Sequence, residues 1–225
     1  MWRALFLGFL FLLPALAAPG RATPAMTGEN AMALIEAVSL GDAAAVARMI
    51  STGAPLEARD AAKRTALLIA TRADHVEIAK LLLDAGADVN AKDNIRDTPF
   101  LYAGAEGRND ILRAIIATGR ADLADTNRYG GTALIPAAHH GHPETVRILL
   151  ETEIDIDHVN HLGWTALLEA VILGDGGPVY LEIVGSLIDA GAGNIADNEG
   201  VTPLDHARRR GFEAMAQRIE RGPRR

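Results

Sequence analysis

Cysteine is absent from the 225 residues of this chain, which excludes a scaffold held together by disulfides. Aromatic residues are scarce, with five Phe, three Tyr and two Trp, so large aromatic side chains alone cannot fill the interior. An excess of basic residues is also missing: the formal net charge is -7, which argues against a protein that neutralises nucleic-acid phosphates. The apolar fraction of 49% is that of an ordinary folded protein and excludes a disordered acidic chain.

Apolar runs long enough to cross a membrane, about 20 residues, are absent as well. The longest, Ala4–Leu13, follows the basic Arg3 and precedes the small residues Ala15 to Ala18. This order is typical of a cleavable secretory signal. We expect residues 1–17 to be a signal peptide, cut near Ala17, and the mature chain to carry no integral membrane segment. The Ala-rich cleavage region favours a bacterial periplasm, while a eukaryotic secretory route stays open.

A short segment that begins with Thr recurs along the rest of the chain. The five copies are spaced 33, 34, 33 and 37 residues apart and begin at Thr65, Thr98, Thr132, Thr165 and Thr202. Five residues after each Thr stands an alanine: Ala70, Ala103, Ala137, Ala170 and Ala207. Nine residues after it stands a glycine in four copies (Gly107, Gly141, Gly174 and Gly211) and Asp74 in the first. A period this regular predicts stacked copies of one structural unit.

A period near 33 residues, with Thr-Pro-Leu opening a helix at Thr202, resembles the ankyrin repeat. The resemblance implies an all-α repeat fold, a solenoid of helix-turn-helix units with short β-hairpin fingers. We expect each Thr hydroxyl to cap the first helix of its unit, and the inward alanine to let neighbouring helices approach closely. Gly53, Gly86 and Gly191 are expected to end second helices in a left-handed conformation.

We expect one domain of six repeats over residues 29–221, including a cap at each end. Residues 18–28 are predicted to be a short linker, and residues 222–225 a basic tail. The fifth repeat contains an insertion, Asp175–Val179, whose glycines and proline predict a loop more than extra helix. Pro178 could start the second helix of that repeat.

The sequence offers no catalytic, cofactor-binding or metal-ligating constellation. It has no Gly-rich phosphate loop, no Gly-x-Ser-x-Gly and no metalloprotease His pair. Four histidines cluster in the fourth repeat and the finger after it: His139, His140, His158 and His161. A metal site would require two or more of them to converge, so solvated or partner-contacting histidines are the favoured interpretation.

In the ankyrin family, partners are usually bound by the finger tips and the exposed face of each first helix. Carried over to this chain, the candidate partner-binding residues are Tyr129, His139, His140, Leu162, Trp164, Ile172 and Leu173. Tyr129 and Trp164 stand out because Tyr and Trp are the commonest hot-spot residues of interfaces. The alternative is that Trp164 packs on its own finger and Tyr129 only shields a neighbour.

These observations predict a monomeric, exported, non-enzymatic protein that binds another protein through its concave groove, without a cofactor and without nucleic acid. One specific hypothesis is an accessory factor for a periplasmic enzyme such as a catalase, because catalase-associated ankyrin proteins of bacteria are similar in size and export signal. The alternative is an inhibitor or immunity protein that neutralises a toxin in the periplasm. A metal-dependent enzyme is a third option, resting on the histidine cluster alone.

Overall fold

The computed structural model describes residues 24–224, which form twelve α-helices and no β-strand. The first helices of the successive pairs are α1 (Pro24–Leu40), α3 (Ala66–Arg72), α5 (Pro99–Ala105), α7 (Leu134–His139), α9 (Ala166–Ile172) and α11 (Pro203–Arg209). The second helices are α2 (Ala43–Ser51), α4 (Val76–Asp84), α6 (Asn109–Ala117), α8 (Pro143–Leu150), α10 (Pro178–Asp189) and α12 (Glu213–Arg221). In the described part of the chain, no helix is long and apolar enough to span a bilayer.

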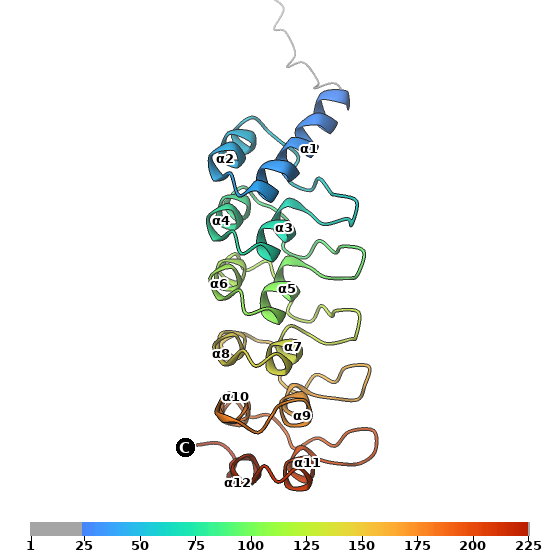
Figure 1. The fold of residues 1–225 in the computed structure, drawn as a ribbon, viewed down its shortest axis with the longest axis vertical. Helices are drawn as coiled ribbons and strands as arrows, with labels where there is room; N and C mark the ends of the chain where they lie inside the picture. Colours follow the sequence, from blue (N-terminus) through green and yellow to red (C-terminus); the bar gives the residue numbers. More distant parts are fainter. Residues whose placement is uncertain (1–23, 225) are drawn as a thin grey trace, which may run out of the picture.

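The six helix pairs stack in chain order into an elongated solenoid (Figure 1). First helices contact first helices along one column, and second helices contact second helices along the other. The loops that join one pair to the next project as fingers from the side of the first helices (Figure 1). The predicted all-α repeat solenoid is therefore confirmed.

The N-terminal boundary differs from the expected one. The predicted signal peptide, residues 1–17, lies outside the described residues. Helix α1 begins at Pro24, so part of the segment 18–28 predicted as a linker is helical. Proline is well suited to the first position of a helix, because its φ is already helical and the N–H it lacks would be unpaired there.

Helix capping follows the prediction in four of the five Thr repeats. The Thr hydroxyl accepts a hydrogen bond from the backbone N–H three residues on at Thr65, Thr98, Thr165 and Thr202. Thr132 is the exception and corrects the prediction. Ala133 already has helical dihedrals (φ -57, ψ -26), so the buried Thr132 hydroxyl finds no hydrogen-bond partner in the described chain.

The insertion in the fifth repeat is part loop and part helix: residues 175–177 lie outside any helix, as predicted, and the second helix starts at Pro178. Helix α10 begins at Pro178 and has 12 residues, whereas α4 has 9. Gly177 precedes it in an extended conformation as its N-cap. The added helical turn is held in place by Tyr180, whose hydroxyl donates a 2.8 Å hydrogen bond to the carbonyl of His139 in the preceding repeat.

Each finger is organised by one Asp or Asn placed five residues before the Thr. These residues are Asp60, Asp93, Asn127, Asn160 and Asp197. In every case the side-chain Oδ1 accepts hydrogen bonds from the backbone N–H groups two and four residues on. Such Asx turns fold a finger without a strand, and the expected hairpin character is limited in the described residues to one isolated bridge between Arg59 and Thr65.

Small and branched aliphatic side chains fill the space between the helix layers. The five inward alanines have no exposed surface: Ala70, Ala103, Ala137, Ala170 and Ala207. Phe100 is the only fully buried aromatic side chain among the described residues. This explains the shortage of aromatic residues, since a solenoid has no single large core.

Arg120, the residue added to the third finger, caps the preceding repeat. Its guanidinium donates hydrogen bonds to the carbonyls of Leu83 (3.1 Å), Gly86 (3.0 Å) and Ala87 (3.0 Å) at the end of α4. We expect Arg120→Ala to lower the free energy of unfolding by about 1 kcal/mol, because the carbonyls lose a charged donor but remain near solvent. Urea denaturation followed by circular dichroism measures this change.

Arg113→Ala is the matched control for Arg120. Arg113 pairs with Glu144 at 3.4 Å, and half of each side chain is exposed, so the loss should be close to zero. Equal losses for the two variants would contradict the capping role of Arg120.

Candidate protein-binding groove

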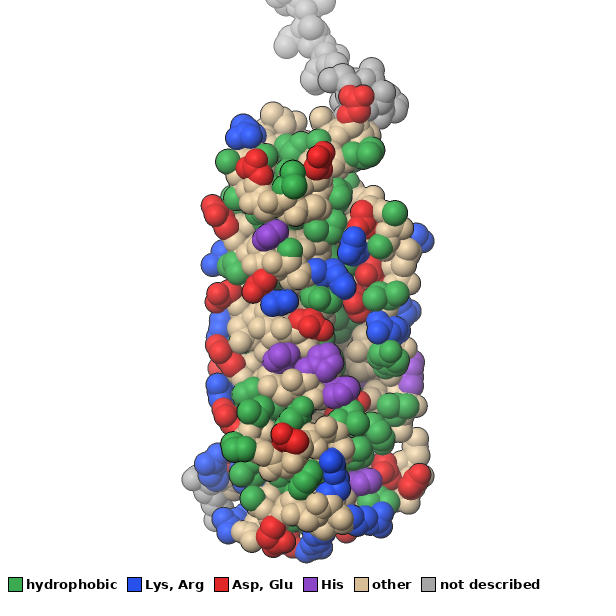
Figure 2. Space-filling view, in the orientation of Figure 1, with side chains coloured by type: hydrophobic (Ala, Val, Ile, Leu, Met, Phe, Trp, Pro, Cys, Tyr) green, Lys and Arg blue, Asp and Glu red, His purple; other side chains and the backbone are tan. Residues whose placement is uncertain are grey.

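A hollow of about 410 Å³ lies where the fingers meet the first helices in the middle of the solenoid. Its walls come from α5, α7 and α9 and from the three fingers that precede them. Histidines gather midway along this face, with hydrophobic side chains beside them (Figure 2). We call this hollow the central groove; its lining includes Asp97, Tyr102, Glu106, Arg128, Tyr129, Pro136, His139, His140, Asn160, Leu162, Glu169 and Leu173.

Five of the seven predicted partner-binding residues line the central groove: Tyr129, His139, His140, Leu162 and Leu173. They come from two fingers and two helices that are distant in sequence. Tyr129 and Leu162 are more than half exposed, at 56% and 54%, and Leu173 is 42% exposed. The groove therefore has an apolar rim that is open to solvent.

Trp164 and Ile172 do not line the groove. Trp164 is half-buried, and its backbone N–H donates to Oδ1 of Asn160 in the same finger at 3.1 Å. Ile172 is half-buried at the end of α9, and its carbonyl accepts a hydrogen bond from Arg210.

Glu169 is the groove residue that sequence reasoning missed. It lies on α9 and is only 5% exposed, although its carboxylate borders the hollow. Its Oε1 accepts a 2.8 Å hydrogen bond from Nδ2 of Asn160, and its Oε2 lies 3.3 Å from Nδ1 of His139. Burial raises the pKa of Glu169, because removal from water disfavours the charged carboxylate.

A signal for Glu169 does exist in the sequence. Glu169 stands four residues after Thr165, and the equivalent residues Tyr102 and Pro136 also line the groove. The predicted set took helix positions seven and eight after the Thr and overlooked position four. A carboxylate in a helix otherwise built from Ala, Leu, Val and Ile was the available clue.

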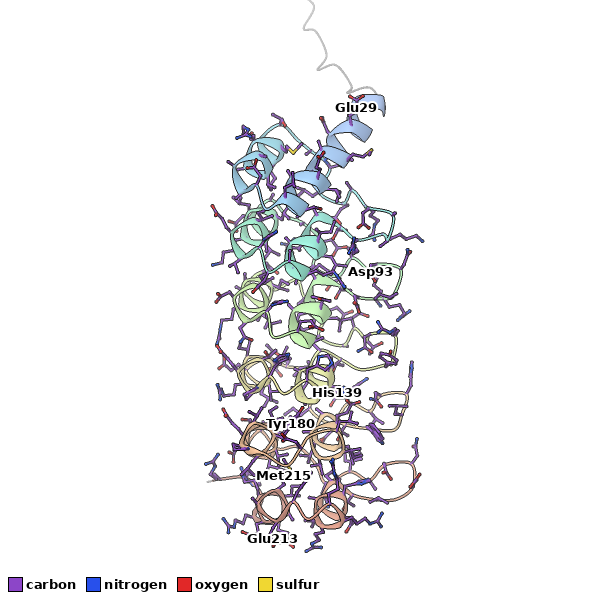
Figure 3. The ribbon with its side chains drawn as sticks, in the orientation of Figure 1. Glu29, Asp93, His139, Tyr180, Glu213 and Met215 are labelled. Atoms are coloured by element: carbon purple, nitrogen blue, oxygen red, sulfur yellow. The ribbon has the colours of Figure 1, made fainter. Side chains whose placement is uncertain are left out.

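The histidines are held mainly by the protein itself. His140 Nδ1 lies 2.7 Å from the carbonyl of Ala105, and His158 Nε2 lies 2.7 Å from that of Gly130, so each of these nitrogens carries a hydrogen. Burial, and then the charge of His140, lowers the pKa of His139 below its ordinary value of 6.5. His139 projects in the middle of the stack, above the repeat that carries Tyr180 (Figure 3).

A metal site has no geometric basis in the described residues, where no three His, Asp or Glu side chains converge. The central groove offers an apolar rim around polar groups, a surface suited to recognition.

Acidic groups dominate the charge of the central groove. Asp97, Glu106 and Glu169 line it, and Arg128 is the one Lys or Arg of the lining. The pKa of Asp97 is raised by burial and by the neighbouring Asp93, although Arg72 lies 3.5 Å away. The guanidinium of Arg128 lies over the ring of Tyr129, 4.6 Å from its centroid.

Known proteins with similar sequences share the repeats. The family profile described as "Ankyrin repeats (3 copies)" matches residues 2–93 and 91–160. The ankyrin repeat protein YahD of Escherichia coli (strain K12) is 41% identical over 98 residues, which are 43% of this chain and 49% of YahD. The chain thus spans about half the length of this curated relative.

Solved structures share the whole arrangement. An ankyrin repeat domain from Acinetobacter baumannii AYE is 52% identical with a TM-score of 0.81, covering 83% of this chain and 95% of that domain. The ankyrin repeat protein EF0377 is 41% identical with a TM-score of 0.82, covering 84% and 97%. The ankyrin repeat domain of Bcl-3, a member of the IkappaB protein family, is 29% identical with a TM-score of 0.76, covering 85% and 86%.

Ankyrin repeats are in general protein–protein interaction modules and are typically not enzymes. The repeat register, the stacked helix pairs and the family match lead to one conclusion: the chain belongs to the ankyrin repeat family.

Proposed function

We propose that this protein binds another protein through the central groove, as a non-enzymatic interaction module. One observation carries the proposal: Tyr129, Leu162 and Leu173 expose apolar surface around a single hollow. Exposed apolar side chains gathered at a concave site are typical of binding surfaces. The rigid helices beneath them keep this surface preformed, which lowers the entropy lost on binding.

The test compares two double variants of the protein as bait in a pull-down from extracytoplasmic extract. Tyr129→Ala with Leu162→Ala removes two groove side chains and should weaken capture of the partner by about 30-fold, the loss of roughly 2 kcal/mol expected for a hot spot. Val179→Ala with Ile195→Ala removes exposed apolar side chains outside the groove and should leave capture unchanged. Equal capture by both variants would refute binding through the central groove.

The location proposed for this interaction is the periplasm, reached through the signal at residues 1–17. The support is the order of Arg3, the apolar Ala4–Leu13 and the small residues that follow. We expect N-terminal sequencing of the expressed protein to begin near Ala18. Leu10→Arg, which interrupts the apolar stretch, should leave the chain uncleaved, and cleavage that survives this change would contradict an export signal.

Within this proposal, the role favoured by the export signal and the chain length is that of an accessory factor for a periplasmic enzyme such as a catalase. The captured partner decides this point. An enzyme whose thermal inactivation is slowed by the protein would support an accessory role. If the partner is a toxin and the protein blocks its activity, the protein is an inhibitor or immunity protein instead.

A further inference from the structure

We infer that the partner presents a lysine or arginine side chain to the central groove, where its cationic end meets Glu169 and apolar residues beside it cover the rim. This inference rests on the proposed function and names the chemistry of the partner segment. It follows from three features of the groove: its charge, the pairing of Glu169 and the position of the apolar side chains.

The charge of the groove favours a cation. Three carboxylates line it, from Asp97, Glu106 and Glu169, against the guanidinium of Arg128. Arg128 is occupied with the ring of Tyr129, over which it lies at 4.6 Å. An anionic segment would meet net repulsion on this wall, whereas a basic one would be attracted.

Glu169 lacks a permanent cation of its own in the described part of the chain. Of the other two carboxylates that line the groove, Asp97 pairs with Arg72 at 3.5 Å, whereas Glu106 is exposed to water and lies 4.0 Å from Nδ1 of His140. The one ion-pair partner of Glu169 is His139, which is mostly neutral at pH 7 because burial lowers its pKa. A buried carboxylate held only by neutral donors destabilises a fold. A ligand cation would complete the site.

The apolar rim suits the stem of a long basic side chain. Lys and Arg carry an aliphatic chain that packs on apolar surface while the charged end reaches a polar group. Tyr129, Leu162 and Leu173 border the same hollow as Glu169 and remain exposed. A wholly apolar segment could cover this rim, but it would seal Glu169 from water without a counter-ion, which disfavours it.

Two synthetic peptides test the inference on the purified protein by NMR titration. One has the sequence Ala-Leu-Lys-Leu-Ala with blocked ends, and the other replaces Lys with norleucine, which keeps the stem and removes the charge. We expect the Lys peptide to bind at least tenfold more tightly at pH 7.5. Glu169→Gln should abolish this difference, and Glu144→Gln, which changes an exposed carboxylate on α8 outside the groove, should preserve it.

The Glu169→Gln variant should fold normally. Gln retains an oxygen for the Asn160 amide, and the raised pKa of Glu169 means that burying the charged carboxylate costs the fold stability, a cost that neutral Gln avoids. Its melting temperature is therefore expected to equal or exceed that of the wild type. A lower melting temperature would show that the carboxylate serves the fold and would overturn its assignment to a ligand.

The preference for Lys should also weaken at acidic pH. As the pH falls, His139 takes up a proton and pairs with Glu169 in place of the ligand, and Glu169, whose pKa burial raises, loses its own charge. The other charged or titratable groups that line the groove are Asp97, Glu106, Arg128, His140, Tyr102 and Tyr129. His139→Asn removes the competing cation and should reduce the pH dependence to the part that comes from protonation of Glu169.

Equal affinity for the two peptides, or a Lys preference that survives Glu169→Gln, would overturn the inference. So would the absence of binding by the Lys peptide at millimolar concentration. None of these results decides the proposed function, which depends separately on the Tyr129 and Leu162 pull-down.

Discussion

Phe100→Ala is expected to lower the free energy of unfolding by about 3–5 kcal/mol, the range found when a buried aromatic side chain is truncated. Phe100 lies on α5 with no exposed surface, and α5 packs against α3, α6 and α7. Its removal leaves a void that three helices border, and the short helices cannot close it without moving apart. Urea denaturation followed by circular dichroism gives the change in free energy.

Phe100→Leu is the control for this prediction. Leucine occupies the equivalent position in the other four Thr repeats, as Leu67, Leu134, Leu167 and Leu204, and the first three of these are fully buried. The substitution should therefore destabilise by about 1.5 kcal/mol or less, since it largely preserves the filling of the site. Similar losses for Ala and Leu would show that Phe100 acts through its aromatic ring and that the repeats are not interchangeable at this position.

The fold could be predicted from the sequence because the same short-range features recur in successive repeats. Thr caps, inward alanines and turn glycines act over a few residues, so their spacing fixes the helix boundaries. Asp74, which stands in place of the turn glycine in the first Thr repeat, adopts the same left-handed conformation as that glycine: its φ is 57°, and that of Gly107 is 67°. Thr132 departs from the pattern because its helix, α7, begins at Leu134, two residues after the Thr instead of one. Nothing in the sequence indicates this later start.

The groove was less predictable, because its members meet only through packing. Tyr129, Leu162 and Leu173 could be placed by homology of position, since finger tips and helix ends recur in every repeat. Trp164 and Ile172 occupy a finger and a helix end like the other predicted residues but do not line the groove, a difference that their position in the repeat does not reveal. Glu169 was not predicted because its place in the groove depends on Asn160, which lies in the finger before α9. A pattern within one helix does not describe this contact.

Gly104→Leu is expected to lower the free energy of unfolding by about 3 kcal/mol, at the upper end of the usual effect of overpacking. Gly104 is buried on α5, where a Cβ would lie 2.8 Å from the Cβ of Ala133 and 3.3 Å from its carbonyl oxygen. A leucine there must push the fourth repeat away from the third. Repeat arrays are coupled through nearest neighbours, so the two halves of the solenoid should then unfold in separate steps.

Two further variants bracket the Gly104 result. Gly104→Ala adds one methyl group at the same contact, and its better helix propensity offsets part of the strain, so a smaller loss is expected. Ala117→Leu introduces the same leucine side chain at an exposed position of α6 and should leave the stability unchanged. Denaturation curves that remain a single transition with an unchanged midpoint in Gly104→Leu would contradict the tight contact between the third and fourth repeats.

The same substitution connects the packing of the repeats to the groove. Helix α5 supplies Tyr102 and Glu106 to one wall, and α7 supplies His139 and His140 to the other. The hydrogen bond from His140 to the carbonyl of Ala105 spans the contact that Gly104 makes possible. Separation of these helices should break this bond and widen the groove, so partner binding should fall together with stability. Binding that persists at wild-type strength after the halves uncouple would mean that the α5–α7 contact does not shape the binding surface.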